Sequence, residues 1–410
     1  MTEQESNISR RNFIGTAALA GVALAACGKT GTKSGSDIYI PTLYDQAPDG
    51  PVLKAGLVGC GGRGTGAAWD FLRAGPNLQI VALADTFKDR VDSCREQIKK
   101  RSGQEVPASR CFVGLDSYKK VLDTDIDVVL MATPPYYRPV QFAAAVEAGK
   151  HVFIEKPMGV DPVGCRSVMQ TASIAKTKGL NVMTGTHRRH WEKYTETLKR
   201  ILDGAIGDIV AARIYYNTSQ LWYRQRQKGW SNLDWMIRDW VNWRWLSGDH
   251  IVEQHIHDID AVNWFTGSHP VKAVGLGSRQ RRPTGDQYDN FSVDFEFENG
   301  MHVQSMSRQI DGCINNVSQT FVGTKGWALC RQAEPNVIYR SDGSEVWRYE
   351  KESNAWASDN PARIMPYIQE HVHLVRAIRT GEQVNKAYDT AVSNLVAVMG
   401  RESAYSGKET

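Results

Sequence analysis

The clearest chemistry in this sequence is carried by three glycines with the spacing G-x-G-x-x-G and by one aspartate further along the chain. Gly59 permits a tight turn after an apolar run, Gly61 lets backbone approach a pyrophosphate, and Gly64 lets the following helix pack closely. Asp85 ends a second apolar run, 21 residues after Gly64, where a carboxylate can hold the ribose hydroxyls of NAD. The alternative is that Asp85 only caps a helix after a buried strand. Together these residues predict a dinucleotide-binding loop.

A second reactive position is Lys156, which follows the apolar run 151–154 and stands between Glu155 and Pro157. A lysine at the mouth of a parallel sheet, beside a bound nicotinamide, can donate a hydrogen bond to a substrate hydroxyl. It then stabilises the alkoxide that develops there. The alternative is a surface lysine paired with Glu155. We interpret Lys156 as catalytic.

The stretch 248–260 is rich in histidine and acidic residues. At about 100° per residue, one helix face carries His250, Glu253, His257 and Asp260, while His255 lies on the opposite side. A histidine suits the removal of a hydroxyl proton while hydride leaves the same carbon. Two alternatives are a metal site and a merely structural polar helix. Because His255 points away and no further Cys or His cluster follows, we expect no metal.

Half of the twelve tryptophans fall between residues 222 and 245, with arginines interleaved. Aromatic faces stack on sugar C–H groups, and guanidinium groups bind hydroxyls or carboxylates. The alternative is ordinary core and interface packing. We predict a sugar-binding wall, with a contribution from the basic residues that open the same domain. The predicted substrate-binding residues are Arg188, Arg189, His190, Trp222, Arg238, Trp240, His250 and Glu253.

These residues need a particular scaffold. Apolar strands and amphipathic helices alternate from residue 53 to about 155, which predicts a doubly wound parallel sheet. Strand-like runs at 209–216, 271–275, 291–298, 301–308 and 319–322 then predict a large, mainly antiparallel sheet, with a hairpin at Asn299-Gly300. Helices are expected at 138–148, 160–178, 364–380 and 390–403. The predicted fold class is therefore α/β, with a Rossmann domain (53–185) and a C-terminal α+β domain (186–410).

The N-terminus does not resemble part of a fold. Residues 9–14 have the twin-arginine form, Ser-Arg-Arg-Asn-Phe-Ile, and a short apolar stretch ends in Leu-Ala-Ala before Cys27. This pattern predicts an export signal over residues 1–34 with a lipobox, so that a lipidated Cys27 would anchor a periplasmic protein. A buried N-terminal helix is the alternative. Residues 35–52 are expected to form an arm or linker.

Composition excludes several classes of protein. The 410 residues are enough for two domains, and the net charge of +4 is small and interspersed, so we expect no nucleic-acid partner. Mean hydropathy is −0.41, and the body of the chain has no apolar run long enough to span a bilayer. The seven cysteines show no C-x-x-C spacing, which argues against a zinc ribbon or a dithiol motif.

Several motifs together resemble the Gfo/Idh/MocA family of oxidoreductases. They are the glycine loop, Ala84-Asp85, Ala132-Thr133-Pro134, Ala148-Gly149-Lys150-His151-Val152 with Glu155-Lys156-Pro157, Thr186-His187-Arg188-Arg189, and Gly204-x-Ile206-Gly207-Asp208-Ile209. The resemblance implies catalytic roles for Glu253 and His257, with Glu in place of the more usual Asp, and a homo-oligomer built on the second sheet. Arg138 departs from the family, where many members have a histidine. The resemblance and the motifs together predict a cofactor site of Gly59, Gly61, Gly62, Arg63, Gly64, Asp85, Arg90, Thr133, Pro134, Glu155 and Lys156.

The sequence thus predicts an exported oxidoreductase that moves hydride between a secondary hydroxyl of a sugar or glycoside and NAD. Asp85 favours NAD, while Arg90 leaves NADP open. Export removes the protein from cytoplasmic nucleotide pools, so we expect a tightly bound cofactor that is recycled in place. One alternative is a glycoside hydrolase that uses bound NAD transiently. Another is a sugar-binding lipoprotein without activity.

Overall fold

The computed structural model describes residues 38–350 and 365–410. The predicted export signal, including the twin-arginine motif and Cys27, lies outside the described residues. From Tyr39 to Thr410 the chain belongs to one structural unit. None of the helices described in these ranges is long and apolar enough to cross a membrane.

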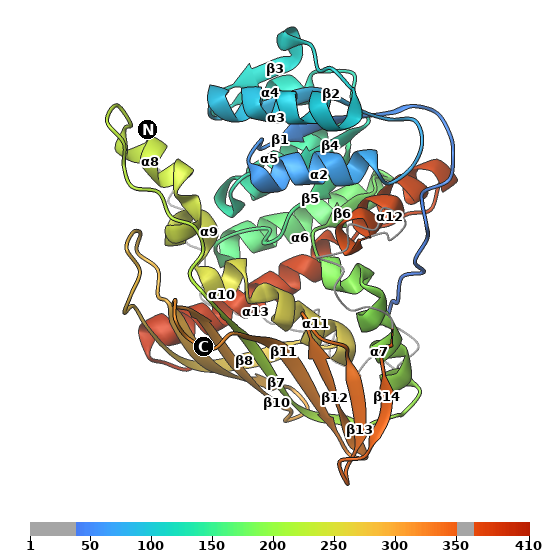
Figure 1. The fold of residues 1–410 in the computed structure, drawn as a ribbon, viewed down its shortest axis with the longest axis vertical. Coiled ribbons are helices and arrows are strands. Elements are labelled where there is room, and N and C mark those ends of the chain that lie inside the picture. The colour runs from blue at the N-terminus through green and yellow to red at the C-terminus, as the bar shows by residue number, and fades with distance from the viewer. Residues whose placement is uncertain (1–37, 351–364) are drawn as a thin grey trace, which may run out of the picture. The chain divides into compact units, whose positions relative to one another are not determined.

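The first sheet has six parallel strands in the order β3-β2-β1-β4-β5-β6. The strands are β1 (Leu53–Val58), β2 (Leu78–Asp85), β3 (Cys111–Val113), β4 (Val128–Met131), β5 (His151–Ile154) and β6 (Val182–Thr184). The crossovers contain α2 (Gly62–Leu72), α3 (Lys88–Ser102), α4 (Ser117–Leu122), α5 (Arg138–Glu147) and α6 (Pro162–Thr177). Strand order reverses between β1 and β4, which is where ligands bind in such sheets. The predicted Rossmann fold is confirmed (Figure 1).

The second sheet has eight strands in the order β14-β13-β12-β11-β7-β10-β9-β8. Only the β7–β10 pair is parallel, so the predicted mainly antiparallel sheet is confirmed. The predicted hairpin at Asn299-Gly300 joins β9 to β10, with Gly300 at φ 79°. The strands are β7 (Ile209–Thr218), β8 (Pro270–Ser278), β9 (Asn290–Phe297), β10 (His302–Gln309), β11 (Asn316–Gly323), β12 (Gly326–Arg331), β13 (Val337–Arg340) and β14 (Glu345–Arg348).

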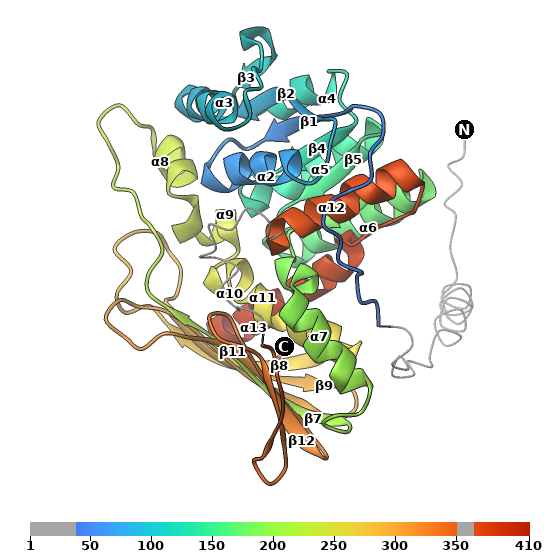
Figure 2. The same cartoon turned by 45° about the vertical axis from the view of Figure 1, so that its right-hand side comes forward.

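Helices cover one face of the second sheet (Figures 1 and 2). They are α7 (Glu192–Leu202), α11 (Ile256–Thr266) and α13 (Ala387–Ser406). Phe265 of α11 stacks on Phe321 of β11, with ring centroids 4.4 Å apart. Val274 and Leu276 of β8 and Met306 of β10 are exposed, because alternate residues of a strand point to opposite faces.

The C-terminal helices return to the first domain. Apolar residues of α12 (Pro366–Thr380), among them Ile368 and Val372, join the core formed by β1, β4 and α2. Val182 of β6 exchanges backbone hydrogen bonds with Val384 and Lys386, at 2.8 and 2.9 Å. Residues placed by sequence in the second domain therefore complete the core of the first.

The described part of the expected linker is packed. The Ala47 amide donates to the Ala74 carbonyl at 2.7 Å, and Ala47 is fully buried. His373 Nε2 lies 2.8 Å from the Thr42 carbonyl, and Arg379 donates to the Pro48 carbonyl at 2.6 Å. Residues 39–52 thus form an ordered arm along α12.

Candidate functional site

The glycine loop has the shape that a dinucleotide requires. Gly59 has φ 98°, and a Cβ on Gly64 would lie 1.7 Å from the Gly59 carbonyl oxygen. Any other residue at position 64 would push α2 away from the loop. A Cβ on Gly61 or Gly62 would have no neighbour within 4 Å, so this side of the loop faces open space.

Asp85 lies at the end of β2, beside this loop. Its Oδ2 accepts a hydrogen bond from the Cys60 amide at 2.7 Å, and its Oδ1 accepts one from the Phe87 amide at 3.0 Å. Burial raises the pKa of Asp85, and the two amides oppose that rise by stabilising the carboxylate. Asp85 therefore links the glycine loop to the segment that begins α3, as a ribose-binding carboxylate should.

A cavity of about 360 Å³ extends from the loop, and we call it the nucleotide cavity. Nine of the predicted cofactor residues line it: Gly59, Gly61, Gly62, Arg63, Gly64, Asp85, Arg90, Thr133 and Pro134. The other two, Glu155 and Lys156, line a second cavity of about 260 Å³. Arg63 lines both, so the two cavities adjoin at its side chain. The loop, the carboxylate and the cavity fit a bound dinucleotide.

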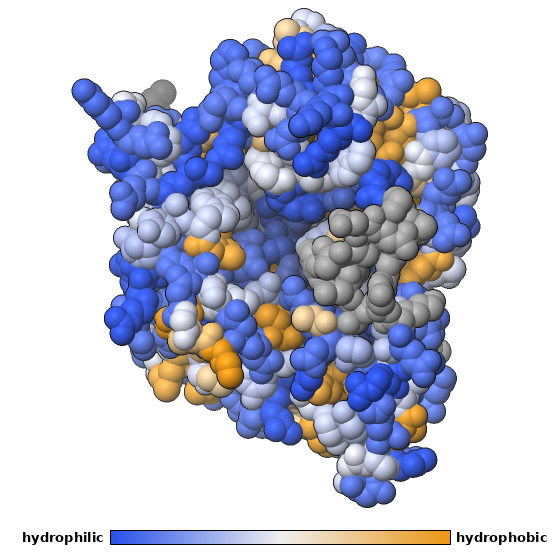
Figure 3. Space-filling model, in the orientation of Figure 1, coloured by the Kyte–Doolittle hydropathy of each residue, from blue (hydrophilic) through white to orange (hydrophobic). Residues whose placement is uncertain are grey.

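The second cavity, which we call the substrate cavity, lies between the two domains. It is lined by Lys156 of the first domain and by Glu253 and His257 of the second. A hydrophilic hollow is visible between the two sheets in Figure 3. The structure thus brings together the three predicted catalytic residues, although Lys156 precedes Glu253 by 97 positions in the sequence.

Lys156 makes two hydrogen bonds across the domain boundary. Its Nζ donates to Glu253 Oε1 at 2.9 Å and to the Glu253 carbonyl at 2.5 Å. Both side chains are largely buried. The other carboxylate oxygen of Glu253 accepts from Gln254, whose Oε1 accepts from the Tyr216 hydroxyl at 2.9 Å. Glu253 therefore holds the ammonium group of Lys156 towards the substrate cavity.

His257 is buried beside this ion pair. Its ring centroid lies 4.5 Å from that of His187. Burial lowers the pKa of His257 well below its ordinary value, and the positive charges of Lys156 and Arg188 lower it further. His257 is therefore neutral at pH 7 and has a nitrogen able to accept a proton.

Arg138 supports the Lys156 loop through backbone. The guanidinium donates to three backbone carbonyls, those of Thr133 at 2.8 Å, Glu155 at 2.9 Å and Pro157 at 2.5 Å. Burial lowers the pKa of Arg138 to about 10. Arg138 thus joins the residues that follow β4 to those that follow β5. This role could not be predicted from sequence motifs, because the acceptors are backbone carbonyls.

Glu155 and Arg63 connect the same loop to the glycine loop. Arg63 Nε lies 2.9 Å from Glu155 Oε1, and Arg63 Nη2 donates to Asp70 at 2.7 Å. A Cβ on Gly185 would lie 2.3 Å from Glu155 Oε2, so glycine at 185 makes room for the carboxylate. Arg63 thereby couples the position of α2 to that of Lys156.

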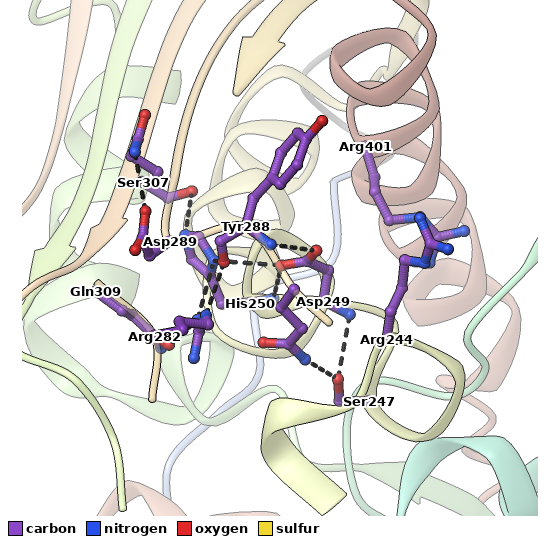
Figure 4. Close-up of polar contacts among 12 residues, drawn as sticks. Arg244, Ser247, Asp249, His250, Arg282, Tyr288, Asp289, Ser307, Gln309 and Arg401 are labelled. Atoms are coloured by element: carbon purple, nitrogen blue, oxygen red, sulfur yellow. Dashed lines mark hydrogen bonds and ion pairs between the residues drawn. The ribbon is translucent and has the colours of Figure 1, made fainter. Parts of the chain in front are cut away.

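The predicted helix over 250–260 is wrong, because the segment forms two helices. The first, α10 (His250–Glu253), ends before Gln254, and α11 begins at Ile256. His250 is not among the residues that line the substrate cavity, and it lies in a buried polar cluster (Figure 4). Its Nε2 lies 3.2 Å from Ser307 Oγ, and its Nδ1 lies 3.2 Å from the Tyr288 carbonyl. Burial lowers the pKa of His250. The prediction that His250 contacts substrate is not supported by this position.

The basic residues that open the second domain are separated by the fold. Arg188 lines the substrate cavity but is ion-paired with buried Asp258. Arg189 makes two 2.8 Å hydrogen bonds to Asp260, and His190 Nδ1 lies 2.7 Å from His373 Nδ1. In the described structure, Arg189 and His190 lie away from both cavities. Buried carboxylate and imidazole partners, which the sequence pattern does not show, account for this.

The tryptophan stretch divides into two groups. Trp222 and Trp240 line both cavities, with ring centroids 6.2 Å apart. Trp235 and Trp243 pack against each other at 5.2 Å, as the packing alternative predicts. Arg238 lines the nucleotide cavity, where it is ion-paired with Asp89, rather than the substrate cavity. Its expected sugar contact is therefore not supported.

Among the residues of the substrate cavity that the sequence analysis did not identify, four have polar side chains: Tyr216, Gln254, Gln332 and Tyr367. They come from β7, the break between α10 and α11, the segment after β12, and α12. No local motif marks them, since only the fold brings them together. Among the described residues, no group of three or more His, Cys, Asp or Glu side chains is placed to hold a metal ion.

The fold and the two adjoining cavities define a two-domain oxidoreductase that binds a nicotinamide dinucleotide. Residues 53–186 match the oxidoreductase family with an NAD-binding Rossmann fold, and residues 194–329 match the GFO/IDH/MocA C-terminal domain. The chain belongs to the Gfo/Idh/MocA family of NAD-binding oxidoreductases.

Several curated relatives carry glycosidase names. Glycosyl hydrolase family 109 protein 4 of Phocaeicola vulgatus is 28% identical over 65% of this chain and 51% of its own length. The alpha-N-acetylgalactosaminidase of Shewanella oneidensis is 26% identical over 53% of this chain and 47% of its own. The matches thus span about half the length of these relatives.

Solved structures share the fold. The apo scyllo-inositol dehydrogenase of Lactobacillus casei is 22% identical, with a TM-score of 0.66 over 88% of this chain and 98% of its own. The aldose-aldose oxidoreductase of Caulobacter crescentus is 18% identical, with a TM-score of 0.67 over 88% of this chain and 99% of its own.

Proposed function

We propose that this protein moves hydride between a secondary hydroxyl of a neutral sugar or glycoside and a retained nicotinamide cofactor. The observation that carries the proposal is the juxtaposition of Lys156, Glu253 and neutral His257 in one cavity that adjoins the glycine loop. When bound, the nicotinamide supplies an acceptor for the hydride. NAD is the expected cofactor, with NADP also compatible through Arg90 in the nucleotide cavity.

The residues divide the proton chemistry between them. His257 accepts the hydroxyl proton, because burial and neighbouring positive charges keep its imidazole neutral. Lys156 donates a hydrogen bond to the same oxygen and stabilises negative charge as it develops. Glu253 orients Lys156 from 2.9 Å and can accept a hydrogen bond from a neighbouring hydroxyl of the substrate.

The lining of the substrate cavity favours a neutral substrate. Arg63, Lys156 and Arg188 each lie beside a carboxylate. Arg138, which also lines the cavity, donates to three backbone carbonyls, so each of these cations already has a partner. Trp222 and Trp240 provide aromatic faces for sugar C–H groups. Hydroxyl-rich neutral rings suit this combination, and we propose C3 as the oxidised carbon, giving a 3-keto sugar.

We also propose that the protein works in the periplasm. The twin-arginine motif and the sequence before Cys27 support export and lipid anchoring. Twin-arginine export carries folded proteins, so a cofactor can be loaded beforehand. A retained nucleotide is then recycled in place, by oxidising one sugar and reducing another acceptor.

The glycosidase names among the relatives favour a second candidate, a glycoside hydrolase with transient oxidation. The ring hydroxyl is first oxidised to a ketone, which acidifies the neighbouring C–H. Loss of that proton expels the aglycone, water adds to the resulting double bond, and the ketone is reduced again. Lys156 and His257 serve both candidates, so the cavity itself does not separate them.

One experiment tests both candidates. Purified protein is incubated with a panel of neutral glycosides, and products are identified by mass spectrometry and NMR. Keto sugars without aglycone release support the oxidoreductase, whereas aglycone release without net keto sugar supports the hydrolase. Neither product from any glycoside, with nucleotide bound, would contradict the proposed substrate class.

A further inference from the structure

The nucleotide cavity is walled by both domains. One wall is the glycine loop and the ends of β1, β2 and β4. The other is contributed by residues 222–240 of the second domain, which we call the strap. Strap residues lining the cavity are Trp222, Arg224, Ile237, Arg238 and Trp240. A nucleotide in this cavity would therefore be covered by a segment that lies outside the Rossmann fold.

The strap contains α8 (Asn232–Arg238), the helix that carries Arg238 at its end. Ser231 and Asp234 form a capping box at its start. The indole of Trp235 donates to the Arg224 carbonyl at 2.6 Å, and Asp239 Oδ1 accepts from the Arg224 amide at 2.7 Å. The two ends of the strap are thus tied together by hydrogen bonds.

Arg238 joins the strap to the Rossmann domain. Its two terminal nitrogens donate to the two carboxylate oxygens of Asp89, at 2.9 and 2.7 Å. Its guanidinium also lies 3.8 Å from the centroid of the Phe87 ring. Phe87 and Asp89 follow Asp85 at the start of α3, which is the ribose side of the cavity. The contact therefore joins the two walls of the nucleotide cavity on the side of Asp85.

We propose that the strap completes the dinucleotide site and that the Arg238–Asp89 pair is a latch that sets the rate of cofactor release. This proposal rests on the nucleotide part of the proposed function. A nucleotide held under the strap leaves only when this pair separates. The latch gives a physical reason for a cofactor that stays bound through turnover.

The size of the effect follows from the exposure of the pair. The Asp89 side chain is 60% exposed, so solvent weakens the ion pair, while the Arg238 side chain is 14% exposed and stacks on Phe87. An exposed ion pair and a cation–π contact are both weak interactions, so removal of both should raise the release rate about tenfold.

The test measures nucleotide release from the full-length protein. Wild type, Arg238→Gln, Asp89→Asn and the double variant are loaded with NADH, and its fluorescence is followed after addition of excess NAD. We expect Arg238→Gln to release NADH about tenfold faster, and Asp89→Asn, which keeps the contact between Arg238 and Phe87, to release it a few-fold faster. The double variant should be no faster than Arg238→Gln. The reversed pair, Arg238→Asp with Asp89→Arg, should recover the part of the slow release that the ion pair provides.

Arg200→Gln is the matched control. Arg200 pairs with Glu196 at 2.8 Å and lies 4.2 Å from the centroid of Trp347, so it has the same two contacts away from the nucleotide cavity. This variant should release NADH at the wild-type rate. If both latch variants release NADH at the wild-type rate while the wild type binds it tightly, the strap proposal is wrong and the proposed function is unaffected. A wild-type protein that binds no nicotinamide nucleotide would overturn the proposed function and the strap with it.

Discussion

The two walls of the substrate cavity are built differently. Lys156 stands on a loop that Arg138 holds in place. The Arg138 guanidinium donates to three backbone carbonyls in the segments that follow two neighbouring strands. Glu253 stands on α10, a four-residue helix whose start is fixed by the carboxylate of Asp249. That carboxylate accepts hydrogen bonds from the His250 amide at 2.6 Å and from the Tyr405 hydroxyl at 2.6 Å. One wall is thus held through backbone and the other through side chains.

This difference separates the fixed part of the site from the adjustable part. Backbone carbonyls at the ends of a parallel sheet cannot change without disturbing the sheet itself. A side-chain network can change one residue at a time, so Glu253 and its surroundings are where specificity can vary. The ion pair between Lys156 and Glu253 joins the two walls at 2.9 Å. Substitutions on either side therefore test the comparison.

The largest effect is expected for Lys156→Met. Loss of the hydrogen bond to the developing alkoxide should lower kcat about 10³-fold, measured as keto-sugar formation. Lys150→Met is the control. Lys150 precedes β5 at its opposite end and donates to the Ile126 carbonyl at 2.8 Å. Similar losses in both variants would mean that folding, rather than catalysis, was affected.

His257→Asn should lower kcat about 10²-fold, because the general base is lost. In the wild type, kcat/KM for oxidation should stay flat as pH falls to 6.5 and decline only at lower pH. The direction of this pH dependence follows from the lowered pKa of His257. Because the pKa lies below the ordinary value of 6.5, the imidazole is still neutral at pH 6.5 and can accept a proton. The acid limb should disappear in the variant. A wild-type limb above pH 6.5 would exclude His257 as the base.

Arg138→Lys tests the wall held through backbone. Lysine keeps the positive charge but cannot span three carbonyls, so kcat should fall about tenfold while nucleotide affinity is kept. Arg379→Lys is the matched control, because Arg379 also donates to several backbone carbonyls away from the cavities, those of Pro48, Pro51, Pro76 and Asn77. It should lower the melting temperature without lowering kcat. Equal effects of the two variants on kcat would contradict a positioning role for Arg138.

Substitutions of Asp249 test the wall that carries Glu253, and we expect them to have the smallest effect on activity. Asp249 has φ 82° and ψ 162°, a region that is nearly restricted to glycine and costs about 1–3 kcal/mol. Asp249→Ala keeps this strain and loses the carboxylate, whereas Asp249→Gly loses both. We therefore expect Asp249→Ala to be less stable than Asp249→Gly by about 1–3 kcal/mol in urea unfolding.

Both variants should lower kcat about threefold, because α10 is no longer tied to Tyr405. Asn77, the other described non-glycine residue with positive φ (53°), provides the control pair. Asn77→Ala and Asn77→Gly should differ in stability but leave kcat unchanged. Asp249 variants with wild-type kcat would show that α10 does not depend on this carboxylate.

The nucleotide half of the site was predictable because its signals are local. The glycines, Asp85 and the strand before Lys156 each lie within a short stretch at the end of one strand of the parallel sheet. The substrate half was only partly predictable. Glu253 and His257 were identified, yet the helix breaks between them and turns His250 away. The partners of Arg189 and His190, Asp260 and His373, are distant in sequence and could not be inferred from periodicity.

The strap is a second region for which the sequence predicted only part of the site. Its tryptophans and arginines matched the pattern of a sugar-binding wall, and Trp222 and Trp240 do line the substrate cavity. Arg238 instead pairs with Asp89, 149 positions away. Composition identified a ligand-contacting segment, but which ligand each residue faces depends on how the second domain lies over the first.

The central claim is hydride transfer within the cavity that holds Lys156 and His257. The most direct measurement uses a glycoside deuterated at the carbon that becomes the ketone, incubated with purified protein in ordinary water. Mass spectrometry of the nucleotide extracted from the protein should then show one deuterium on the nicotinamide in the wild type and none in Lys156→Met. Keto sugar formed with no deuterium on the nucleotide would contradict the account.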